Sequence, residues 1–477
     1  MFQEPAIHEL TIFTKPYPSA KHPHHNSMAF KNLTKTHSEE PYMSNQVDQL
    51  PVNQANHLEI GGVDSLDLVK QYKTPLVVYD VKAIRDQIHH FQKVFNDNGV
   101  DYAVSYASKA FACIAMFQLV NQENAHIDVV SGGELYTAIQ AGFPMDHVSF
   151  HGNDKSVAEL EMAVDHQIGV IILDNFHEIA LLKQILTDKD AHINVMLRVT
   201  PGISAHTHEY DQTGQVDSKF GFDLQSGQAR KALDLVLADK RMNMLGIHCH
   251  IGSQIFEVKG FEMAATKLID TLGQWHQEVG YVAKVVNVGG GFGIRYTEED
   301  DPIAPEMFVD AIVKAIKKRV GELSLPMPAV WIEPGRSIAG PAGYNLYTVG
   351  SRKDVPGIRS YVTVDGGMGD NIRPALYQAK YEAVLASNPK APIKETVRVA
   401  GKYCESGDIL IQKQDLPATK PGDVLAMLAT GAYGYAMASN YNRNPRPAVV
   451  FVENGQSQVV IKRETFADLV SLDQPLR

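Results

Sequence analysis

Eight short apolar runs cross the middle of the chain, and each ends in polar residues or glycines. Most runs are almost continuously aliphatic, as in VIILD at 170–174, which is typical of strands buried on both faces of a parallel sheet. Segments with helical spacing of apolar residues lie between them, for example at 157–164 and 308–316. The runs occupy residues 104–109, 127–131, 148–152, 170–174, 193–198, 245–250, 285–291 and 330–336.

The alternation of eight strands with helices predicts an α/β fold in which the strands close into a (β/α)8 barrel. Functional side chains of such barrels lie at the carboxyl ends of the strands, and phosphate sites often follow strands seven and eight. The polar tails of the runs fall at these ends. An open doubly wound sheet is the alternative that the same eight runs leave open.

The sequence pattern changes after Arg336. Short β-rich runs separated by Gly and Pro turns follow, in place of segments with helical spacing. An earlier run, TPLVVYD at 74–80, reads as a strand that can join them. A chain of 477 residues is also too long for one ordinary domain. We therefore predict a barrel over 80–337 and a mostly antiparallel β domain over 58–79 and 338–477.

Residues 1–57 are polar, rich in His, Pro and Asn, and lack periodicity, which predicts a disordered extension. The cluster KHPHH at 21–25 is compatible with metal binding, but a solvated stretch is favoured and no metal site is predicted. We expect neither a signal peptide nor a transit peptide here. Met43 is a candidate internal translation start, so residues 1–42 are expected to be dispensable.

The formal net charge of −11 disfavours nucleic acid and anionic membranes as partners. No apolar run is long enough to span a bilayer. The three cysteines, Cys113, Cys249 and Cys404, have neither metal-ligand spacing nor a disulfide pattern, which fits a reducing cytoplasm.

Three of the polar tails carry groups that together suit pyridoxal phosphate. Lys109 ends the first run; a lysine can form a Schiff base, and burial would lower its pKa and free the amine. Gly289, Gly290 and Gly291 follow the seventh run, where backbone amides can hold a phosphate. Glu333 closes the eighth run, and its carboxylate can keep a proton on a pyridine nitrogen.

Each of these groups also has an ordinary structural explanation. Lys109 can be a solvated surface charge, the glycines can form a simple turn, and Glu333 can belong to a structural salt bridge. The residue types and their spacing alone leave these alternatives open.

Seven short motifs follow one another along the chain: YASKA at 106–110, HCHIGSQ at 248–254, GGGFG at 289–293, EPGRS at 333–337, NIRPALY at 371–377, CESGD at 404–408 and GAY at 431–433. Jointly and in this order they resemble the fold-type III pyridoxal-phosphate decarboxylases, in particular the branch that acts on diaminopimelate. The resemblance extends from about residue 58 to the end of the chain. One departure is Ala110-Phe111 after the lysine, where relatives often carry Ala-Asn.

The resemblance implies a barrel, a C-terminal β domain and active sites built at a homodimer interface. Lys109 would hold the cofactor and move protons, Glu333 would pair with the pyridinium nitrogen, and His250 would stack on the ring. From the sequence alone His250 can equally be a buried, satisfied histidine, and His248 is expected to support the structure. The other implied cofactor residues are Ser253, Gly289, Gly290, Gly291, Gly335, Arg336 and Tyr433, with Asp128, Ser131 and Glu134 as plausible neighbours.

The implied substrate residues are Arg336, Arg373, Tyr377, Glu405 and Tyr433. Arg373 offers a planar fork for a carboxylate, whereas ornithine and arginine carry a distal positive charge, so this cation favours a dicarboxylic substrate. Tyr377 would add a hydrogen bond, and Glu405 would pair with the distal ammonium. The ordinary alternative for this loop is a surface turn.

Cys404 resembles the family's proton donor, supplied across the dimer interface, and a buried inert cysteine is the alternative. The implied reaction converts meso-2,6-diaminopimelate to L-lysine and CO2, the last step of lysine biosynthesis. Two alternatives are another fold-type III decarboxylase, acting on ornithine, arginine or carboxynorspermidine, and a non-catalytic homologue that regulates partners by dimerising. Retention of Lys109, Glu333 and Cys404 argues against the second.

Overall fold

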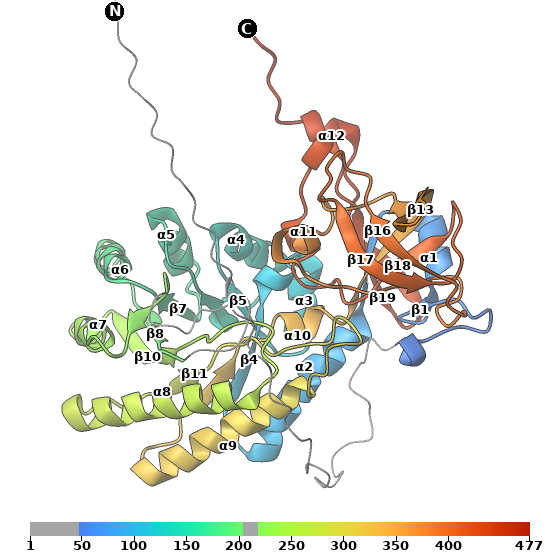
Figure 1. The fold of residues 1–477 in the computed structure, drawn as a ribbon. Coiled ribbons are helices and arrows are strands. Elements are labelled where there is room, and N and C mark those ends of the chain that lie inside the picture. Colours follow the sequence, from blue (N-terminus) through green and yellow to red (C-terminus); the bar gives the residue numbers. More distant parts are fainter. Residues whose placement is uncertain (1–46, 204–217) are drawn as a thin grey trace, which may run out of the picture. The chain divides into compact units, whose positions relative to one another are not determined.

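The computed structural model describes residues 47–203 and 218–477, and within them eight parallel strands close into a barrel (Figure 1). The strands follow the order β10-β11-β12-β4-β5-β6-β7-β8, and β8 pairs back with β10. Their bounds are β4 (Tyr102–Ala107), β5 (His126–Val129), β6 (Val148–Phe150), β7 (Val170–Leu173), β8 (Ile193–Thr200), β10 (Met242–His248), β11 (Val285–Asn287) and β12 (Ala329–Ile332). All eight predicted runs are confirmed as strands, and closure of the barrel excludes the open sheet. The short strand β9 (Phe222–Asp223) pairs in parallel with the end of β8.

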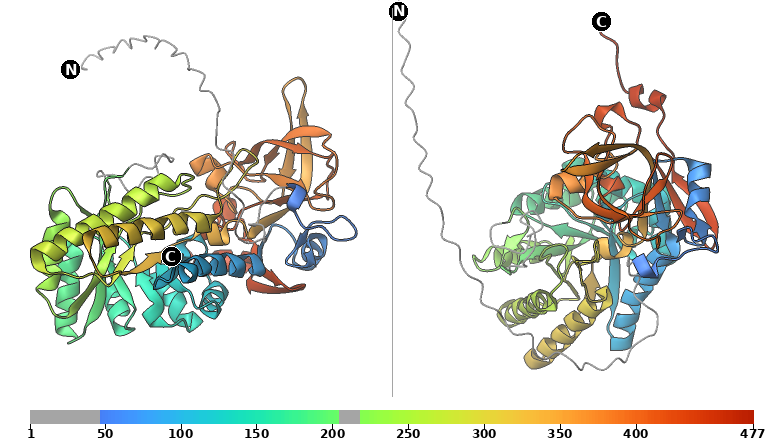
Figure 2. Two further views of the ribbon diagram at one scale, coloured as in Figure 1. Left: turned by 90° about the horizontal axis from the view of Figure 1, so that it is seen from below. Right: turned by 45° about the vertical axis from the view of Figure 1, so that its right-hand side comes forward.

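Helices pack around the outside of these strands (Figures 1 and 2). They are α2 (Val81–Asn98), α3 (Ile114–Gln122), α4 (Gly132–Ala141), α5 (Val157–Asp165), α6 (Phe176–Asp188), α7 (Gln228–Leu237), α8 (Val258–Val279) and α9 (Pro305–Leu323). Several polar residues between strand and helix serve as N-caps: the side chains of Ser131, Ser156 and Asn175 accept backbone N–H bonds at the starts of α4, α5 and α6.

The strand register aligns the carboxyl ends of the barrel. Ala107 pairs with Asp128 between β4 and β5, and His248 pairs with Asn287 between β10 and β11. Residues that follow these positions therefore converge on one end of the barrel, where barrel enzymes place their functional groups.

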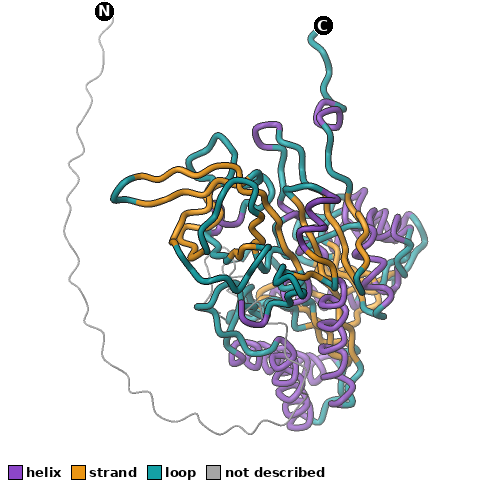
Figure 3. The backbone as a smooth tube through the Cα atoms, turned by 90° about the vertical axis from the view of Figure 1, so that its right-hand side faces the viewer, coloured by secondary structure: helices purple, strands orange, loops and turns teal. Residues whose placement is uncertain are grey.

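The second domain is a mostly antiparallel sheet in the order β17-β16-β14-β13-β3-β19-β20, in which β3 (Leu76–Asp80) lies between β13 and β19. Its other strands are β13 (Gly343–Val355), β14 (Arg359–Val364), β15 (Ala383–Leu385), β16 (Glu395–Ala400), β17 (Ile409–Leu416), β18 (Val424–Met427), β19 (Ala448–Glu453) and β20 (Gln456–Ile461). Figure 3 shows that loops, rather than long helices, join most of these strands. The mostly antiparallel pairing of the strands and the participation of the early strand at 74–80 are both as predicted.

Residues 47–57 are packed against this β domain, so the prediction of disorder up to residue 57 is wrong for them. Leu50 is buried, Val52 bridges to Leu58, and the Leu58 N–H donates to the Ala386 carbonyl. The short strands β1 (Glu59–Ile60) and β2 (Val63–Asp64) and helix α1 (Ser65–Tyr72) follow, and α1 lies beside the orange and red strands in Figure 1. The cluster at 21–25 and Met43 lie outside the described residues.

Among the described residues, no helix combines the length and the apolar composition needed to cross a membrane.

Candidate active site

A cavity of about 440 Å³ lies at the carboxyl ends of the barrel strands. This volume is in the range of small-molecule sites. Ten of the fourteen predicted site residues line it: Lys109, His250, Ser253, Gly291, Glu333, Gly335, Arg336, Arg373, Tyr377 and Tyr433. The four that do not are Gly289, Gly290, Cys404 and Glu405. The barrel and the β domain both contribute side chains to the cavity.

Lys109 lies in a 3-10 turn, Ser108–Ala110, directly after β4. Two backbone hydrogen bonds fix this turn: Ala107 N–H donates to the Pro334 carbonyl at 3.2 Å, and Tyr433 N–H donates to the Ala110 carbonyl at 2.8 Å. The expected burial of the lysine is wrong, because its side chain is exposed where it projects into the cavity. The amine is accessible to a ligand, and its neighbours in the chain are held rigidly.

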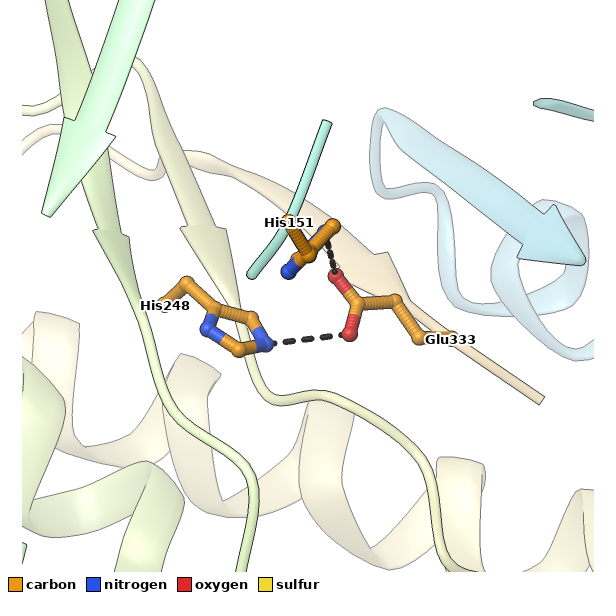
Figure 4. Close-up of side chains that lie close together, drawn as sticks. All are labelled: His151, His248 and Glu333. Carbon is orange, nitrogen blue, oxygen red and sulfur yellow. Dashed lines mark hydrogen bonds and ion pairs between the residues drawn. The ribbon is translucent and has the colours of Figure 1, made fainter. Parts of the chain in front are cut away.

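Glu333 is the centre of a buried polar group built by three adjacent strands. Figure 4 shows this carboxylate beside His248 and His151. Its Oε2 accepts a hydrogen bond from His248 Nε2 at 3.0 Å, and its Oε1 accepts one from Asn287 Nδ2 at 2.6 Å. His248 ends β10, Asn287 ends β11, and Glu333 follows β12. The carboxylate is therefore held by two protein hydrogen-bond donors and also faces the cavity.

A second histidine, His151, approaches the same carboxylate from the end of β6. Its Nε2 lies 3.0 Å from Glu333 Oε1 and 3.8 Å from Asp128 Oδ1, without a well-directed hydrogen bond to a described residue. His151, His248 and Glu333 also have the ligand types and spacing for one metal ion. Because Asn287 already donates an N–H to this carboxylate, we interpret the group as a hydrogen-bonded brace.

The electrostatics of this group favour an ionised Glu333. Burial acts to raise the pKa of Glu333, but His151 and His248 outweigh it and hold the pKa well below its ordinary value. Burial lowers the pKa of His248 to about 4, so its imidazole is neutral at pH 7 and donates its Nε2 hydrogen. Burial, together with the nearby Glu333, raises the pKa of Asp128 to about 6. The site therefore contains one firmly ionised carboxylate beside one that is easily protonated.

The glycine run folds so that most of its amides face the protein. Gly289 N–H donates to Asn287 Oδ1 at 2.9 Å, and Gly290 N–H donates to His250 Nδ1 at 3.2 Å. A Cβ at Gly290 would lie 2.1 Å from the Glu333 carbonyl oxygen, so only glycine permits this close packing. Gly291 alone of the three lines the cavity, so the prediction that this run contacts a phosphate rests on Gly291.

Two guanidinium groups share one phenol on the other side of the cavity. Tyr296 Oη accepts hydrogen bonds from Arg336 at 2.5 Å and from Arg373 at 3.0 Å. Arg336 also donates to Ser253 Oγ at 2.8 Å, and Arg373 donates to Tyr381 Oη at 2.6 Å. Within the described residues, neither arginine forms an ion pair with a carboxylate. Two buried cations without a protein anion make this part of the cavity suited to carboxylate or phosphate groups.

Tyr377 and Tyr433 complete this cationic side of the cavity. The Arg336 guanidinium lies 4.9 Å from the Tyr433 ring, and the Arg373 guanidinium lies 5.9 Å from the Tyr377 ring. Tyr433 adopts φ 60, a left-handed conformation that its backbone bond to Ala110 stabilises. Aromatic faces thus orient both guanidinium groups.

Cys404 and Glu405 occupy an exposed loop of the β domain and do not line the cavity of their own chain. Cys404 N–H donates to Asn442 Oδ1 at 2.8 Å, which fixes the loop against the Tyr441–Arg443 turn. The alternative of a buried, inert Cys404 is wrong, because this residue is exposed.

The remaining predicted neighbours differ in role. Asp128 lines the cavity, whereas Ser131 caps α4. Glu134 accepts the Val130 N–H at 2.7 Å and lies 2.7 Å from Ser108 Oγ, so it supports the turn that carries Lys109. We interpret Ser131 and Glu134 as structural.

Sequence reasoning assigned no role to several residues of the site, among them His151, Arg198, Asn287 and Tyr296. His151 and Arg198 stand in the polar tails of two predicted strands, so the position after a barrel strand was the signal that could have found them. Asn287 ends a third strand. Tyr296 lies in a loop without a strand pattern, and the sequence carries no signal for it.

The cavity offers a fitting group for each part of pyridoxal phosphate. The Lys109 amine suits its aldehyde, Glu333 suits its ring nitrogen, and Gly291 with Ser253 suits its phosphate. A carboxylate accepts about four hydrogen bonds, and Glu333 has two well-directed protein donors, so acceptor capacity remains.

Comparisons with known proteins agree with this set of residues. Residues 81–340, more than half of the chain, match the family model described as pyridoxal-dependent decarboxylase, pyridoxal binding domain. The diaminopimelate decarboxylase of Bacillus methanolicus is 59% identical over 413 residues, covering 87% of this chain and 96% of that protein. The diaminopimelate decarboxylase of Bacillus subtilis is 56% identical over 425 residues, covering 89% and 97%.

Solved structures show the same similarity. A crystal structure of diaminopimelate decarboxylase from M. jannaschii in complex with L-lysine superposes with a TM-score of 0.83 at 33% identity, covering 90% of this chain and 98% of that chain. A lysine/ornithine decarboxylase from Vibrio vulnificus has a TM-score of 0.69 at 21% identity, covering 82% and 97%, and shares the fold.

Proposed function

The chain belongs to the pyridoxal-dependent decarboxylases and, within them, to the diaminopimelate decarboxylases, and we propose that it converts meso-2,6-diaminopimelate to L-lysine and CO2. The observation that carries this proposal is the cavity itself. It combines an accessible lysine and an ionised, buried glutamate with two arginines that lack a carboxylate partner among the described residues. This reaction is the last step of lysine biosynthesis.

Bound pyridoxal phosphate supplies an electron-accepting ring that stabilises the charge left when a carboxylate departs as CO2. Lys109 would hold its aldehyde carbon through Nζ and, once released, would carry a proton at that atom. Glu333, kept ionised by His151 and His248, would keep the ring nitrogen protonated. Gly291, Ser253 and Gly335 would bind the phosphate side, and His250 would lie against the ring.

Arg373 and Arg336 would select a substrate with a carboxylate at its far end. Burial acts to lower the pKa of Arg373, but Tyr296 and Tyr381 outweigh burial and raise it, so the guanidinium stays charged in the cavity. A diamine-forming substrate such as ornithine would place its distal ammonium against these cations, which is unfavourable. Tyr377 would add a hydrogen bond to the distal carboxylate.

Cys404 and Glu405 would act in the cavity of a second copy of the chain. Both are exposed, and neither lines the cavity of its own chain, which supports a homodimer with shared sites. Cys404 would deliver a proton, and Glu405 would bind the distal ammonium of the substrate. A cytoplasmic location is part of the proposal and rests on the three free cysteines; cell fractionation tests it.

A substrate panel tests the proposed reaction. The purified protein, loaded with pyridoxal phosphate, is given meso-2,6-diaminopimelate, L-ornithine, L-arginine or carboxynorspermidine, and CO2 and the amine product are quantified. We expect CO2 and L-lysine in equal amounts from diaminopimelate, with the Lys109→Ala protein as the blank. Preferential turnover of ornithine, arginine or carboxynorspermidine would identify a different decarboxylase of the same fold. No CO2 from any substrate would favour the regulatory homologue.

A further inference from the structure

A buried carboxylate with no role in the reaction joins the two loops that carry the substrate residues of the β domain. The recognition loop, residues 366–377, carries Arg373 and Tyr377 into the cavity. The presenting loop, residues 401–408, carries Cys404 and Glu405 on the exposed surface. Asp408, the last residue of the presenting loop, is only 3% exposed and contacts the recognition loop.

The two oxygens of Asp408 bind one loop each. Oδ1 accepts the N–H of Met368 in the recognition loop at 2.7 Å, and Oδ2 accepts the N–H of Tyr403 in the presenting loop at 2.8 Å. A backbone hydrogen bond also joins the two loops directly, from Lys402 N–H to the Gly366 carbonyl at 2.9 Å. One side chain therefore fixes both loops through hydrogen bonds to ionised oxygens, which are stronger than neutral ones.

Glycine backbone of both loops packs directly against this carboxylate. A Cβ at Gly401 would lie 2.1 Å from Asp408 Oδ2, and a Cβ at Gly367 would lie 2.6 Å from both oxygens. Glycine is therefore needed on both loops, because the backbone itself packs against the carboxylate. Burial raises the pKa of Asp408, while the N–H groups of Tyr403 and Met368 act to lower it. No ion pair to Asp408 is present among the described residues, so backbone dipoles stabilise this charge.

Short hydrogen-bonded paths lead from Asp408 to the functional side chains. In the recognition loop, Asn371 N–H donates to the Gly367 carbonyl, and Arg373 N–H donates to Asn371 Oδ1 at 3.2 Å. In the presenting loop, Glu405 N–H donates to the Tyr403 carbonyl, and Asp408 N–H donates to the Glu405 carbonyl. Cys404 thus lies in a tight turn that the hydrogen bond from Tyr403 N–H to the Asp408 side chain closes.

We propose that Asp408 is a positioning residue that holds the recognition loop and the presenting loop as one unit. It thereby sets the place of Arg373 in its own cavity and the place of Cys404 and Glu405 in the cavity of a second copy. The two active sites of the dimer are then coupled through a single carboxylate in each chain. This inference rests on the proposed function for its effect on catalysis, but the brace itself is independent of the reaction.

Amide hydrogen exchange tests the brace without any turnover. In Asp408→Asn, one carboxylate oxygen is replaced by an N–H2 group that cannot accept a bond. We expect amides of residues 366–373 and 401–408 to exchange faster together, by about tenfold or more for Met368 and Tyr403. Asp415→Asn, an exposed aspartate of the same domain, is the matched control. Faster exchange in only one of the two loops overturns the proposal.

Mixed dimers with one working active site separate the effect of Asp408 on Arg373 from its effect on Cys404. Pairing Lys109→Ala with Asp408→Asn leaves one active cavity, which has an unbraced Arg373 and a normal Cys404 from the other chain. Pairing wild type with the double variant Lys109→Ala/Asp408→Asn leaves one cavity with a normal Arg373 and a Cys404 from an unbraced loop. The reference is wild type paired with Lys109→Ala.

The first mixed dimer should show KM for diaminopimelate raised about tenfold, and the second should show kcat lowered about tenfold, relative to the reference. Pyridoxal phosphate affinity should be unchanged in both, because Asp408 does not line the cavity. Unchanged constants in either mixed dimer would mean that Asp408 serves one loop only. If Asp408→Asn does not fold, Gly401→Ala perturbs the same contact and takes its place. A reference dimer that releases no CO2 would instead overturn the proposed function, while the exchange result still decides on the brace.

Discussion

Glu333 and His248 are joined by a hydrogen bond of 3.0 Å across 85 positions of the sequence. The strand register makes this contact possible, because His248 pairs with Asn287, and Asn287 pairs with Trp331 just before Glu333. The ends of three neighbouring strands thus supply two hydrogen-bond donors, His248 and Asn287, and their acceptor, Glu333. The carboxylate that would hold the ring nitrogen is oriented by the barrel itself.

Removal of the His248 donor should weaken this carboxylate. His248→Leu leaves Oε2 without its hydrogen bond, so the pKa of Glu333 should rise and the ring nitrogen should be held less firmly. Since a hydrogen bond to a charged group contributes about 1.5–3 kcal/mol, kcat should fall about ten- to hundredfold. A pH titration of the bound cofactor's absorbance measures the effect separately from turnover. His166→Leu, at an exposed histidine after α5, is the control, and an identical titration in both variants would refute the role of His248.

Lys109→Ala should fold normally but lose the visible absorbance of the lysine-bound cofactor and nearly all turnover. The side chain is exposed in the cavity, so its removal creates no buried void and should leave Tm nearly unchanged. Lys259→Ala, at an exposed lysine on α8, should keep both absorbance and activity. Full activity of Lys109→Ala would show that Lys109 does not hold the cofactor.

Complementation tests whether the sites are shared. Lys109→Ala and Cys404→Ala proteins should each be nearly inactive, because one lacks the cofactor amine and the other lacks the proton donor. After subunit exchange, the heterodimer has one intact site and should recover part of the wild-type activity. Mass spectrometry verifies the exchange. Verified heterodimers without recovered activity would show that each site is built from one chain.

Candidate site residues could be predicted from the sequence where they follow a regular barrel strand. Lys109 and Glu333 follow barrel strands, so the strand pattern alone placed both at one end of the barrel. His151 stands in an equivalent position, and the strand pattern contained the same information about it. The contacts of the three glycines were harder to predict. A glycine run indicates a turn, but it does not reveal that the Gly289 and Gly290 N–H groups donate to Asn287 and His250.

Other features could not be obtained from the sequence pattern. Tyr296 bridges two arginines that are 40 and 77 positions away. Only the packing of the β domain against the barrel brings Arg373 to the other two residues. The separation of Cys404 from the cavity of its own chain is likewise a tertiary property. The expectation that Lys109 is buried failed, because a lysine at a strand end can project into an open cavity as easily as into a core.

Asp370 provides a pH test of the recognition loop. Burial raises the pKa of Asp370 to about 7 from an ordinary value of 3.8, with added repulsion from Asp365 and Asp408. A raised folded-state pKa means that the protonated form favours folding; this stabilisation is full below about pH 4 and is lost as the pH rises to about 7. Asp370→Asn stays neutral, so its free energy of unfolding relative to wild type should increase over this range, by at most about 1.4 kcal/mol per pH unit. Denaturant unfolding at several pH values measures it, and a pH-independent difference would contradict the burial argument.

The central claim is that Arg373 selects a substrate with a distal carboxylate, and its most direct test is kcat/KM of Arg373→Ala on two substrates. A charge-assisted contact of about 1.5–3 kcal/mol predicts a loss of about one to two decades for diaminopimelate. The loss should be much smaller for any slow activity on lysine, which lacks that carboxylate, and cofactor absorbance should be unchanged. Arg373→Lys should restore only part of the activity, since an ammonium cannot form the bidentate fork. An equal loss on both substrates, or loss of bound cofactor, would mean that Arg373 only supports the cavity and would contradict the assignment of a dicarboxylic substrate.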